Sequence, residues 1–151
     1  MEASSLEKAR LQSFRLLSLR ARSEKELRDR LSKNHGRDVA DDVIRQLQEA
    51  GYLNDETFAR ERARQLAVGH LKGNRAIEAD LLRKGIDRAV IAGAIQVARE
   101  ELSEPEAIRK LLKRKRDGLS SPPDHPWREK TKRYLLSKGF PMGLIFEMLN
   151  E

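Results

Sequence analysis

The sequence contains no cysteine and no long apolar run, and each absence excludes a class of protein. Without cysteine the chain can form neither disulfides nor metal sites with thiolate ligands. No apolar run approaches the ~20 residues that a membrane-spanning helix requires. Met1–Arg22 also lack the apolar core of a secretory signal. The sequence therefore predicts a cytosolic (cytoplasmic) protein with no membrane partner.

Alternating runs of Val, Ile and Thr are missing too, which argues against half-buried β-strands. Aromatic residues make up only 5% of the chain, and glycine and proline are few. Leu, Ala, Arg, Lys, Glu and Gln dominate instead, and these residues favour helices. We therefore expect an all-α protein.

One segment of the chain recurs. LLRKGIDRAVI at residues 81–91 is repeated as LLSKGFPMGLI at residues 135–145. In both copies a Lys–Gly pair follows a predicted helix, and glycine just past a helix end favours the left-handed conformation that closes it. Asp87 is predicted to cap the next helix, and Pro141 is predicted to lie in a first turn. The first copy has a longer predicted turn at residues 34–38.

Around these turns the chain repeats a pattern of three helices about every 50 residues. The last helix of each copy carries apolar residues at i, i+4, i+5 and i+8, which is typical of a helix that faces a core. These stripes begin at Val39, Ile86 and Phe140. The middle helix of the first copy is predicted to begin at Ser23, which fits a capping box with Glu26. The first helices are expected at residues 6–21, 56 to about 69 and 105 to about 117.

We divide the chain into three-helix repeats at residues 1–54, 55–103 and 104–151. Asn54 or Asp55 and then Ser103 are predicted to cap the first helices of the later repeats. A single unit of this size buries little apolar surface, so the units are expected to stack into an elongated, curved body. The Ser/Pro-rich linker at residues 118–126 is expected to be exposed.

No group of residues indicates catalysis or metal binding. His35, His70 and His125 are scattered without the helical i, i+4 spacing of metal ligands. Neither a glycine-rich phosphate loop nor a nucleophile elbow is found. We expect no catalytic residue, no metal and no cofactor, and a non-enzymatic, monomeric protein. Trp127 and Tyr52 are predicted to be packing residues rather than platforms for nucleic-acid bases.

The net charge is +7, and the excess lies toward the C-terminus. Residues 104–151 carry 11 Lys and Arg against 7 Asp and Glu. RKLLKRKR at residues 109–116 and REKTKR at residues 128–133 fall on two predicted helices of one repeat, where they could form a continuous patch. Such a patch fits phosphate groups or an acidic protein surface. It fits equally well a solvated helix face whose cations favour the helix C-terminus.

Three segments of the chain resemble motifs of a known family. RSEKELRDRL at residues 22–31 resembles the R-x-x-S-E-x-E-L-x-x-x-L opening of RecX regulatory proteins, although Arg22 stands directly before the serine. GYLNDETFA at residues 51–59 resembles their G-Y-L-x-D-x-x-F-A junction. GNRAIEADLLRKGI at residues 73–86 resembles their G-x-x-x-I-x-x-x-L-x-x-K-G-I element. The motifs occur in order, and the resemblance extends over essentially the whole chain.

The resemblance implies tandem three-helix repeats and a partner. RecX proteins bind RecA, the recombinase that forms helical filaments on single-stranded DNA, and they limit filament growth. They thereby damp strand exchange, ATP hydrolysis and the co-protease activity that triggers the SOS response. An elongated body is expected to lie in the filament groove and touch more than one subunit. Weak contact with single- or double-stranded DNA could accompany this.

The basic segments and the last motif supply the candidate partner-binding residues, whether the partner is RecA or DNA. They are Lys72, Arg75, Arg83, Lys84, Arg109, Lys110, Lys113, Arg114, Lys115, Arg116, Arg128, Lys130, Lys132 and Arg133. The chain departs from the family pattern ahead of Ile77, where few cations remain and Asn74 replaces a proline. If that segment contacts the filament, we expect its contribution to be weaker here.

Two other functions are compatible with the same residues. One is a basic helical module that acts mainly by competing for DNA, and it would bind DNA tightly without RecA and lose affinity steeply with salt. The other is a helical adaptor for a different acidic protein, because architecture alone does not define function.

Overall fold

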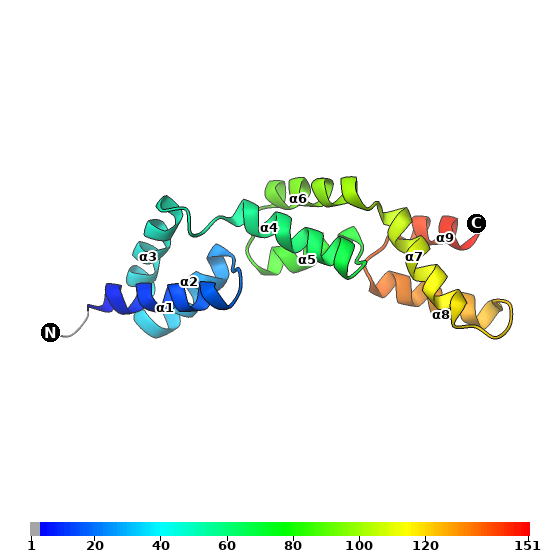
Figure 1. Ribbon diagram of the computed structural model, residues 1–151, viewed down its shortest axis with the longest axis horizontal. Coiled ribbons are helices and arrows are strands. Elements are labelled where there is room, and N and C mark those ends of the chain that lie inside the picture. Colours follow the sequence, from blue (N-terminus) through cyan, green and yellow to red (C-terminus); the bar gives the residue numbers. More distant parts are fainter. Residues whose placement is uncertain (1–3) are drawn as a thin grey trace.

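The computed structural model describes residues 4–151, which fold into nine α-helices and one short π-helix, with no strand (Figure 1). In chain order these are α1 (Ser5–Leu19), α2 (Glu24–His35), α3 (Arg37–Glu49), α4 (Asp55–Arg64), η1 (Gln65–Gly69), α5 (Asn74–Arg83), α6 (Arg88–Glu101), α7 (Glu104–Asp117), α8 (His125–Ser137) and α9 (Met142–Leu149). The first three residues lie outside the described part. The predicted all-α fold is confirmed.

The helices form three groups that follow one another along the long axis of the molecule, with the two ends of the chain far apart (Figure 1). Helices α1–α3 make the first group, α4–α6 with η1 the second, and α7–α9 the third. The predicted architecture of three tandem three-helix repeats in an elongated body is therefore confirmed. The boundaries placed after residues 54 and 103 stay a prediction.

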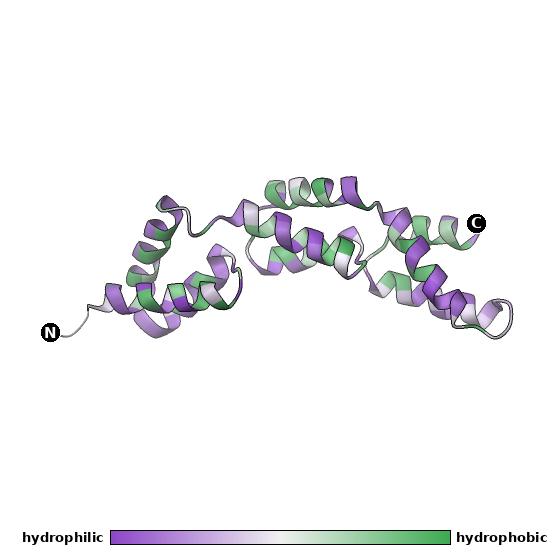
Figure 2. Ribbon diagram, viewed as in Figure 1, coloured by the Kyte–Doolittle hydropathy of each residue, from purple (hydrophilic) through white to green (hydrophobic). Residues whose placement is uncertain are grey.

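Each group has its own hydrophobic core, as the apolar stripes predict. Figure 2 shows the hydrophobic faces of the helices turned toward one another within each group. Leu27 and Leu31 are fully buried in the first core, Ile77 and Leu81 in the second, and Leu135 in the third. Burial of each such side chain contributes about 1.5–3 kcal/mol, so each small core depends on a few leucines and isoleucines.

Most helix starts follow the predicted caps. Ser23 Oγ accepts a hydrogen bond from the Glu26 N–H at 3.2 Å. The Glu26 carboxylate in turn accepts one from the Ser23 N–H at 3.1 Å, which completes the capping box. Ser103 and Glu106 form the equivalent box at α7. Asn54 caps α4, so the choice left open between Asn54 and Asp55 is settled for Asn54.

Three local predictions are wrong. The turn expected at residues 34–38 shrinks to Gly36, because a backbone φ of 87° lets one glycine separate α2 from α3. Pro141 precedes the first turn of α9 as its N-cap residue, with extended backbone. The linker keeps its exposure but ends early, since α8 begins at His125 with Pro126 in its first turn.

The helix predicted from residue 56 to about 69 changes character half-way. It runs as α4 to Arg64 and then widens into η1, where the His70 N–H donates to the Gln65 carbonyl at 3.0 Å. Leu71 follows with a φ of 52°, a strained conformation for a branched side chain. Leu71 is nevertheless 3% exposed, because this conformation directs its side chain into the core of the third repeat.

The repeated Lys–Gly turns hold neighbouring repeats together. Gly85, with a φ of 76°, lies against the start of α2, and a Cβ added there would approach the Lys25 Cβ to 2.6 Å. Gly139, with a φ of 98°, lies against the start of α5, and its added Cβ would come within 2.5 Å of Ala76. Each turn therefore packs on the middle helix of the preceding repeat, and glycine is required both for the conformation and for the close approach.

An acidic residue completes each of these junctions. The Asp55 carboxylate at the start of α4 accepts the Glu24 N–H at 2.8 Å, and the Glu104 carboxylate at the start of α7 accepts the Asn74 N–H at 3.1 Å. Both donors are first-turn N–H groups that have no partner inside their own helix. The first helix of each later repeat thus caps the middle helix of the repeat before it.

The two junctions differ in their apolar content. Leu71 and Leu102 of the second group are buried in the third core, and Val68 contacts both the second and third cores. The buried core of the first group shares no residue with the second. The contact between the first and second groups is therefore mainly polar, whereas the second and third groups are joined by a continuous apolar seam.

Candidate partner-binding surface

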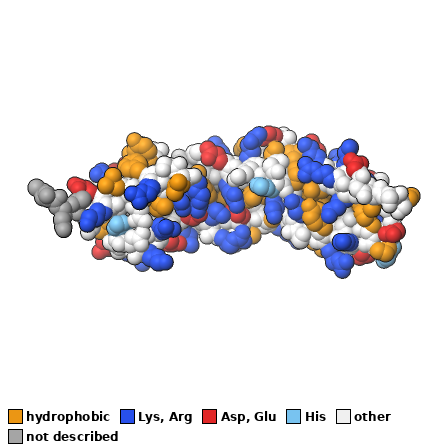
Figure 3. Space-filling model, turned by 60° about the horizontal axis from the view of Figure 1, so that its bottom comes forward, with side chains coloured by type: hydrophobic (Ala, Val, Ile, Leu, Met, Phe, Trp, Pro, Cys, Tyr) orange, Lys and Arg blue, Asp and Glu red, His pale blue; other side chains and the backbone are white. Residues whose placement is uncertain are grey.

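Lysine and arginine side chains spread along the whole length of the face in Figure 3, with acidic side chains between many of them. A cation that already pairs with a carboxylate inside the protein has less to offer to a partner than an unpaired one. What each candidate residue contacts therefore decides how much charge it can offer.

Many cations of the third repeat are paired within it. Arg109 pairs with Glu151 at 3.1 Å, Lys113 with Asp117 at 3.2 Å, and Lys132 with Glu129 at 3.1 Å. The first two pairs are exposed, so each contributes about 0–1 kcal/mol and does not forbid a partner contact. Lys132 is partly buried, and its ammonium lies 4.4 Å from the centroid of the Phe146 ring. The three pairs do lower the net charge that α7 and α8 present to a partner.

Two other candidates pack against the fold rather than point freely into solvent. Arg128 donates to the Leu149 carbonyl and to Asn150 Oδ1 at the end of α9, both at 3.0 Å. The Arg116 guanidinium lies 6.0 Å from the centroid of the Trp127 ring. Trp127 itself is partly buried against the third core, which confirms that it is a packing residue.

Arg83 and Lys84 lie at the first junction, around Asp80. Arg62 makes two hydrogen bonds to the Asp80 carboxylate at 3.0 Å, and Lys84 adds an ion pair at 3.2 Å. Burial alone would raise the pKa of Asp80, but the hydrogen bonds from Arg62 and Lys84 outweigh it and hold that pKa below its ordinary value. Lys84 therefore has a structural role, while Arg83, 3.8 Å from the same carboxylate, is mostly exposed.

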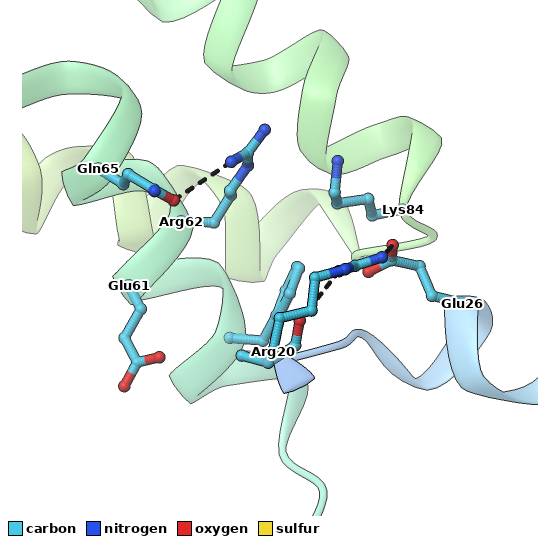
Figure 4. A pocket seen from close by; sticks show the side chains of 8 residues that line it. Arg20, Glu26, Glu61, Arg62, Gln65 and Lys84 are labelled. Carbon is cyan, nitrogen blue, oxygen red and sulfur yellow. Dashed lines mark hydrogen bonds and ion pairs between the residues drawn. The ribbon is translucent and has the colours of Figure 1, made fainter. Parts of the chain in front are cut away.

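Beside this network a cleft of about 640 Å³ separates the first two repeats (Figure 4). Its cationic lining residues Arg20, Arg62 and Lys84 are matched by acids, since Arg20 pairs with Glu26 at 2.9 Å. The cleft therefore carries little unbalanced charge, and it is a weaker candidate for an anionic partner than its size suggests.

A different group of cations lies where the second repeat meets the third. We call Lys72, Arg114, Lys115 and Lys138 the junction cluster. The Lys115 ammonium lies 4.0 Å from the centroid of the Tyr134 ring, and the Lys138 ammonium lies 6.0 Å from the same centroid. Lys138 also donates to the His70 carbonyl at 2.7 Å, which ties the third repeat to the segment that follows η1.

The positive charge of the junction cluster is not balanced by acids. None of its members forms an ion pair with any residue of the described chain. Burial lowers the pKa of Lys138, and repulsion from Lys72 and Arg114 lowers it further. The cluster is therefore a concentration of like charge, held in place by the fold.

The cations of α7 do not all face α8. Arg109 lies toward the C-terminal end of the chain, where it meets Glu151, while Lys115 lies over Tyr134 of α8. The remaining candidates, Arg75, Lys110, Lys130 and Arg133, are exposed and form no ion pair in residues 4–151. The candidates thus fall into a set that is paired or packed within the fold, a dispersed exposed set and the junction cluster.

Two residues of this surface, Lys138 and the Tyr134 ring beneath it, were not among the candidates predicted from the sequence. The repeat itself held the signal, because Lys138 occupies the same Lys–Gly position as Lys84. Lys84 has Asp80 four residues earlier as a partner, whereas Lys138 has Tyr134 there. The exchange of an acid for a tyrosine leaves the second lysine without a counter-charge.

Arg99 was also missed, and it positions the cluster rather than contacting a partner. Its guanidinium donates to Asn74 Oδ1 at 2.7 Å, to the Lys72 carbonyl at 2.8 Å and to the Leu102 carbonyl at 3.3 Å. Burial lowers the pKa of Arg99. These bonds fix the backbone of Lys72 against the start of the third repeat.

The described residues show neither a metal site nor a membrane span. No group of three or more His, Asp and Glu side chains between residues 4 and 151 is placed to hold a metal ion. Within the same range, every helix is too short or too polar to pass through a bilayer.

Comparison with known proteins places this repeat architecture in a family. Models of that family described as the first, second and third three-helix domains of RecX match residues 9–47, 54–95 and 103–149. The chain belongs to the RecX family. A regulatory protein RecX of Mycolicibacterium vanbaalenii is 34% identical, over 95% of this chain and 81% of the relative. A regulatory protein RecX of Syntrophotalea carbinolica is 33% identical, over 92% of each chain.

Solved RecX structures have the same fold. The crystal structure of RecX from Lactobacillus salivarius superposes with a TM-score of 0.82 at 24% identity, covering 97% of this chain and 95% of that one. A second RecX crystal structure gives 0.80 at 23% identity, covering 97% of this chain and 72% of that one. Asn74 stands where the family motif has a proline. Its N–H donates to the Glu104 carboxylate and its side-chain oxygen accepts from Arg99, and proline can provide neither contact.

Proposed function

We propose that this RecX protein binds RecA filaments on single-stranded DNA and limits their growth. It would thereby lower the ATPase, strand-exchange and co-protease activities of RecA and modulate recombinational repair and the SOS response in the cytoplasm. Membership of a family whose relatives are named regulatory proteins supports this proposal. No catalytic step is needed, because binding alone can block the addition of RecA subunits.

The main observation behind this proposal is the junction cluster, whose residues are the proposed contact with the filament. A RecA filament on DNA is a repeating polyanionic assembly, and a surplus of fixed cations is attracted to it. The cluster lies at the more firmly joined of the two junctions, so Lys72 and Lys138 keep their relative positions when the partner arrives. A rigid surface loses less conformational entropy on binding than a mobile one.

The elongated body adds reach to this contact. The three repeats follow one another in a row rather than packing into a sphere (Figure 1), so the cluster and the outer repeats can contact different subunits of a filament. A surface of this shape favours binding to an assembled filament over binding to one free subunit. The protein is expected to act as a monomer.

The test is the DNA-dependent ATPase of the cognate RecA on single-stranded DNA, with this protein titrated in below the RecA concentration. Inhibition well below one copy per RecA subunit is expected, because one molecule then affects many subunits. Inhibition that begins only when the protein covers the DNA would contradict direct action on the filament, and it would favour simple competition for DNA.

A further inference from the structure

We propose that the junction cluster binds the phosphodiester backbone of nucleic acid, so that its ligand in the filament is the bound strand rather than acidic side chains of RecA. The filament part of this inference rests on the proposed function; the contact with nucleic acid does not.

The unbalanced charge can be estimated from the helix ends. Arg114 and Lys115 lie in the last turn of α7, and Lys138 caps the C-terminus of α8. Each helix C-terminus carries about −0.5 charge, so the two ends offset about one of the four positive charges. About three charges then remain without a carboxylate partner, enough to attract several phosphates.

The fold holds these charges together in spite of their repulsion. The Gly73 N–H donates to the Lys138 carbonyl at 2.8 Å, and the Arg75 N–H donates to the Gly139 carbonyl at 3.2 Å. With the bond from the Lys138 ammonium to the His70 carbonyl, these contacts fix the turn that carries Lys138 against the segment that carries Lys72. An anion that binds here relieves the repulsion and orders few additional side chains.

A nucleic-acid backbone fits this arrangement better than a protein surface does. A nucleic-acid strand carries one phosphate per nucleotide, about 3.4 Å apart along the axis of duplex DNA, so several charges meet cations that lie on two repeats. Carboxylates on a protein surface are usually interspersed with cations, which would oppose the cluster. The Tyr134 ring is shared by Lys115 and Lys138 and is not free to stack on a base, so binding is expected to be independent of base sequence.

The probe is a fluorescent oligothymidylate, bound without RecA and followed by anisotropy over a range of salt concentrations. Neutralisation of about three phosphates predicts a slope of log K against log salt of about −2 for a single strand. Affinity should therefore fall about 20-fold between 50 mM and 200 mM salt. A wild-type protein that does not bind, or binds with a slope near zero, overturns the proposal.

The decisive comparison uses two variants of equal charge. Lys72→Gln/Arg114→Gln/Lys115→Gln removes three members of the cluster and keeps Lys138, which holds the junction. Lys8→Gln/Lys33→Gln/Arg60→Gln removes three exposed cations of the first two repeats, unpaired in the described chain and none of them a candidate partner-binding residue. We expect the first variant to bind at least about 10-fold more weakly at 50 mM salt, with less than half the slope, and the second to bind within about 3-fold of wild type. Equal losses in both overturn the proposal, because they would show binding by diffuse charge.

A charge-preserving variant and a parallel assay separate the remaining outcomes. Lys72→Arg/Lys115→Arg should bind like wild type, and loss of binding there would show that packing rather than charge is responsible. RecA ATPase inhibition is measured on the same proteins. If the cluster variant loses inhibition while the wild type fails to bind DNA, the ligand is an acidic surface of RecA and the proposal is wrong. If the wild type binds DNA through the cluster but never inhibits RecA, the phosphodiester site stands and the proposed function fails.

Discussion

Replacing Gly73 with alanine should separate the second and third repeats. The added methyl group would overlap the carbonyl group of Gly139 and come within 2.5 Å of the Phe140 nitrogen. All of these atoms belong to the backbone of the turn between α8 and α9, so no flexible side chain can move aside. The φ of Gly73 is −83°, which any residue adopts, so the expected damage comes from overlap alone.

The size of the effect follows from the contacts that must open. Moving the turn away breaks the hydrogen bonds from Gly73 to Lys138 (2.8 Å) and from Arg75 to Gly139 (3.2 Å), each of which contributes about 1 kcal/mol. Overpacking of a well-filled site costs about 1–3 kcal/mol when the surroundings cannot relax fully. Together these contributions give an expected loss of about 3–5 kcal/mol in the free energy of unfolding.

Urea unfolding followed by two signals tests this expectation. Circular dichroism reports all helices, while Trp127, the one tryptophan of the sequence, reports the third core. The matched control is Gly93→Ala in the middle of α6, where an added Cβ meets nothing within 4 Å. The control should stabilise by about 0.5–1 kcal/mol, because alanine is the better helix former. A Gly73→Ala protein as stable as wild type would show that the repeats do not approach this closely, and the account of the Lys–Gly turns would be wrong.

Three further predictions concern the polar contacts. Asp80→Asn should lower the free energy of unfolding by about 1–3 kcal/mol at neutral pH. Because the pKa of Asp80 is depressed in the folded protein, the stability that its carboxylate contributes should be present above the unfolded pKa and disappear as pH falls through the folded pKa. Urea unfolding of both proteins at several acidic pH values will check this. Arg99→Lys should cost about 1–3 kcal/mol, since lysine cannot make the three contacts of the guanidinium, and the loss should be seen in the Trp127 signal. Ser103→Ala should lower the free energy of unfolding by about 1 kcal/mol, because it removes the cap of α7. Ser120→Ala in the exposed linker, measured by the same urea unfolding, should leave it unchanged.

Local features of this fold could be predicted from the sequence because their causes are local. A capping box needs only Ser23 and a glutamate three residues later, and a Lys–Gly pair after an apolar stripe is enough to predict a left-handed turn. The three apolar stripes likewise predict which side of each last helix is buried. Such features depend on a few neighbouring residues and change little with the rest of the structure.

Contacts between distant parts of the chain were beyond sequence reasoning. Nothing local indicates that Arg109 meets Glu151, or that Lys138 reaches the carbonyl of His70. The left-handed backbone of Leu71 was missed for the same reason, because the packing of its side chain in the neighbouring core compensates the strain. The widening of α4 into η1 at residues 65–69 was missed as well. The basic residues could therefore be identified as candidates, but their division into paired and unpaired sets required the structure.

The prediction for Tyr52 was confirmed only in part. It was predicted to pack, and its ring does meet the Phe14 ring edge-on with centroids 5.2 Å apart. It nevertheless remains 61% exposed, because both rings lie on the outside of the first repeat. Packing and burial are separate outcomes, and residue type alone does not distinguish them.

The way in which the glycine turns pack gives the molecule a direction. Each junction joins two different surfaces, a turn on one repeat and a helix start on the repeat before it, so the contact is head-to-tail. In the described chain, a Cβ added to Gly36, the turn glycine at one end, would meet nothing within 4 Å, and no glycine would bring an added Cβ against the start of α8 at the other. A rod built in this way does not superpose on itself when it is turned end for end. On any polymer that itself has polarity, it can therefore make the same set of contacts in one orientation only.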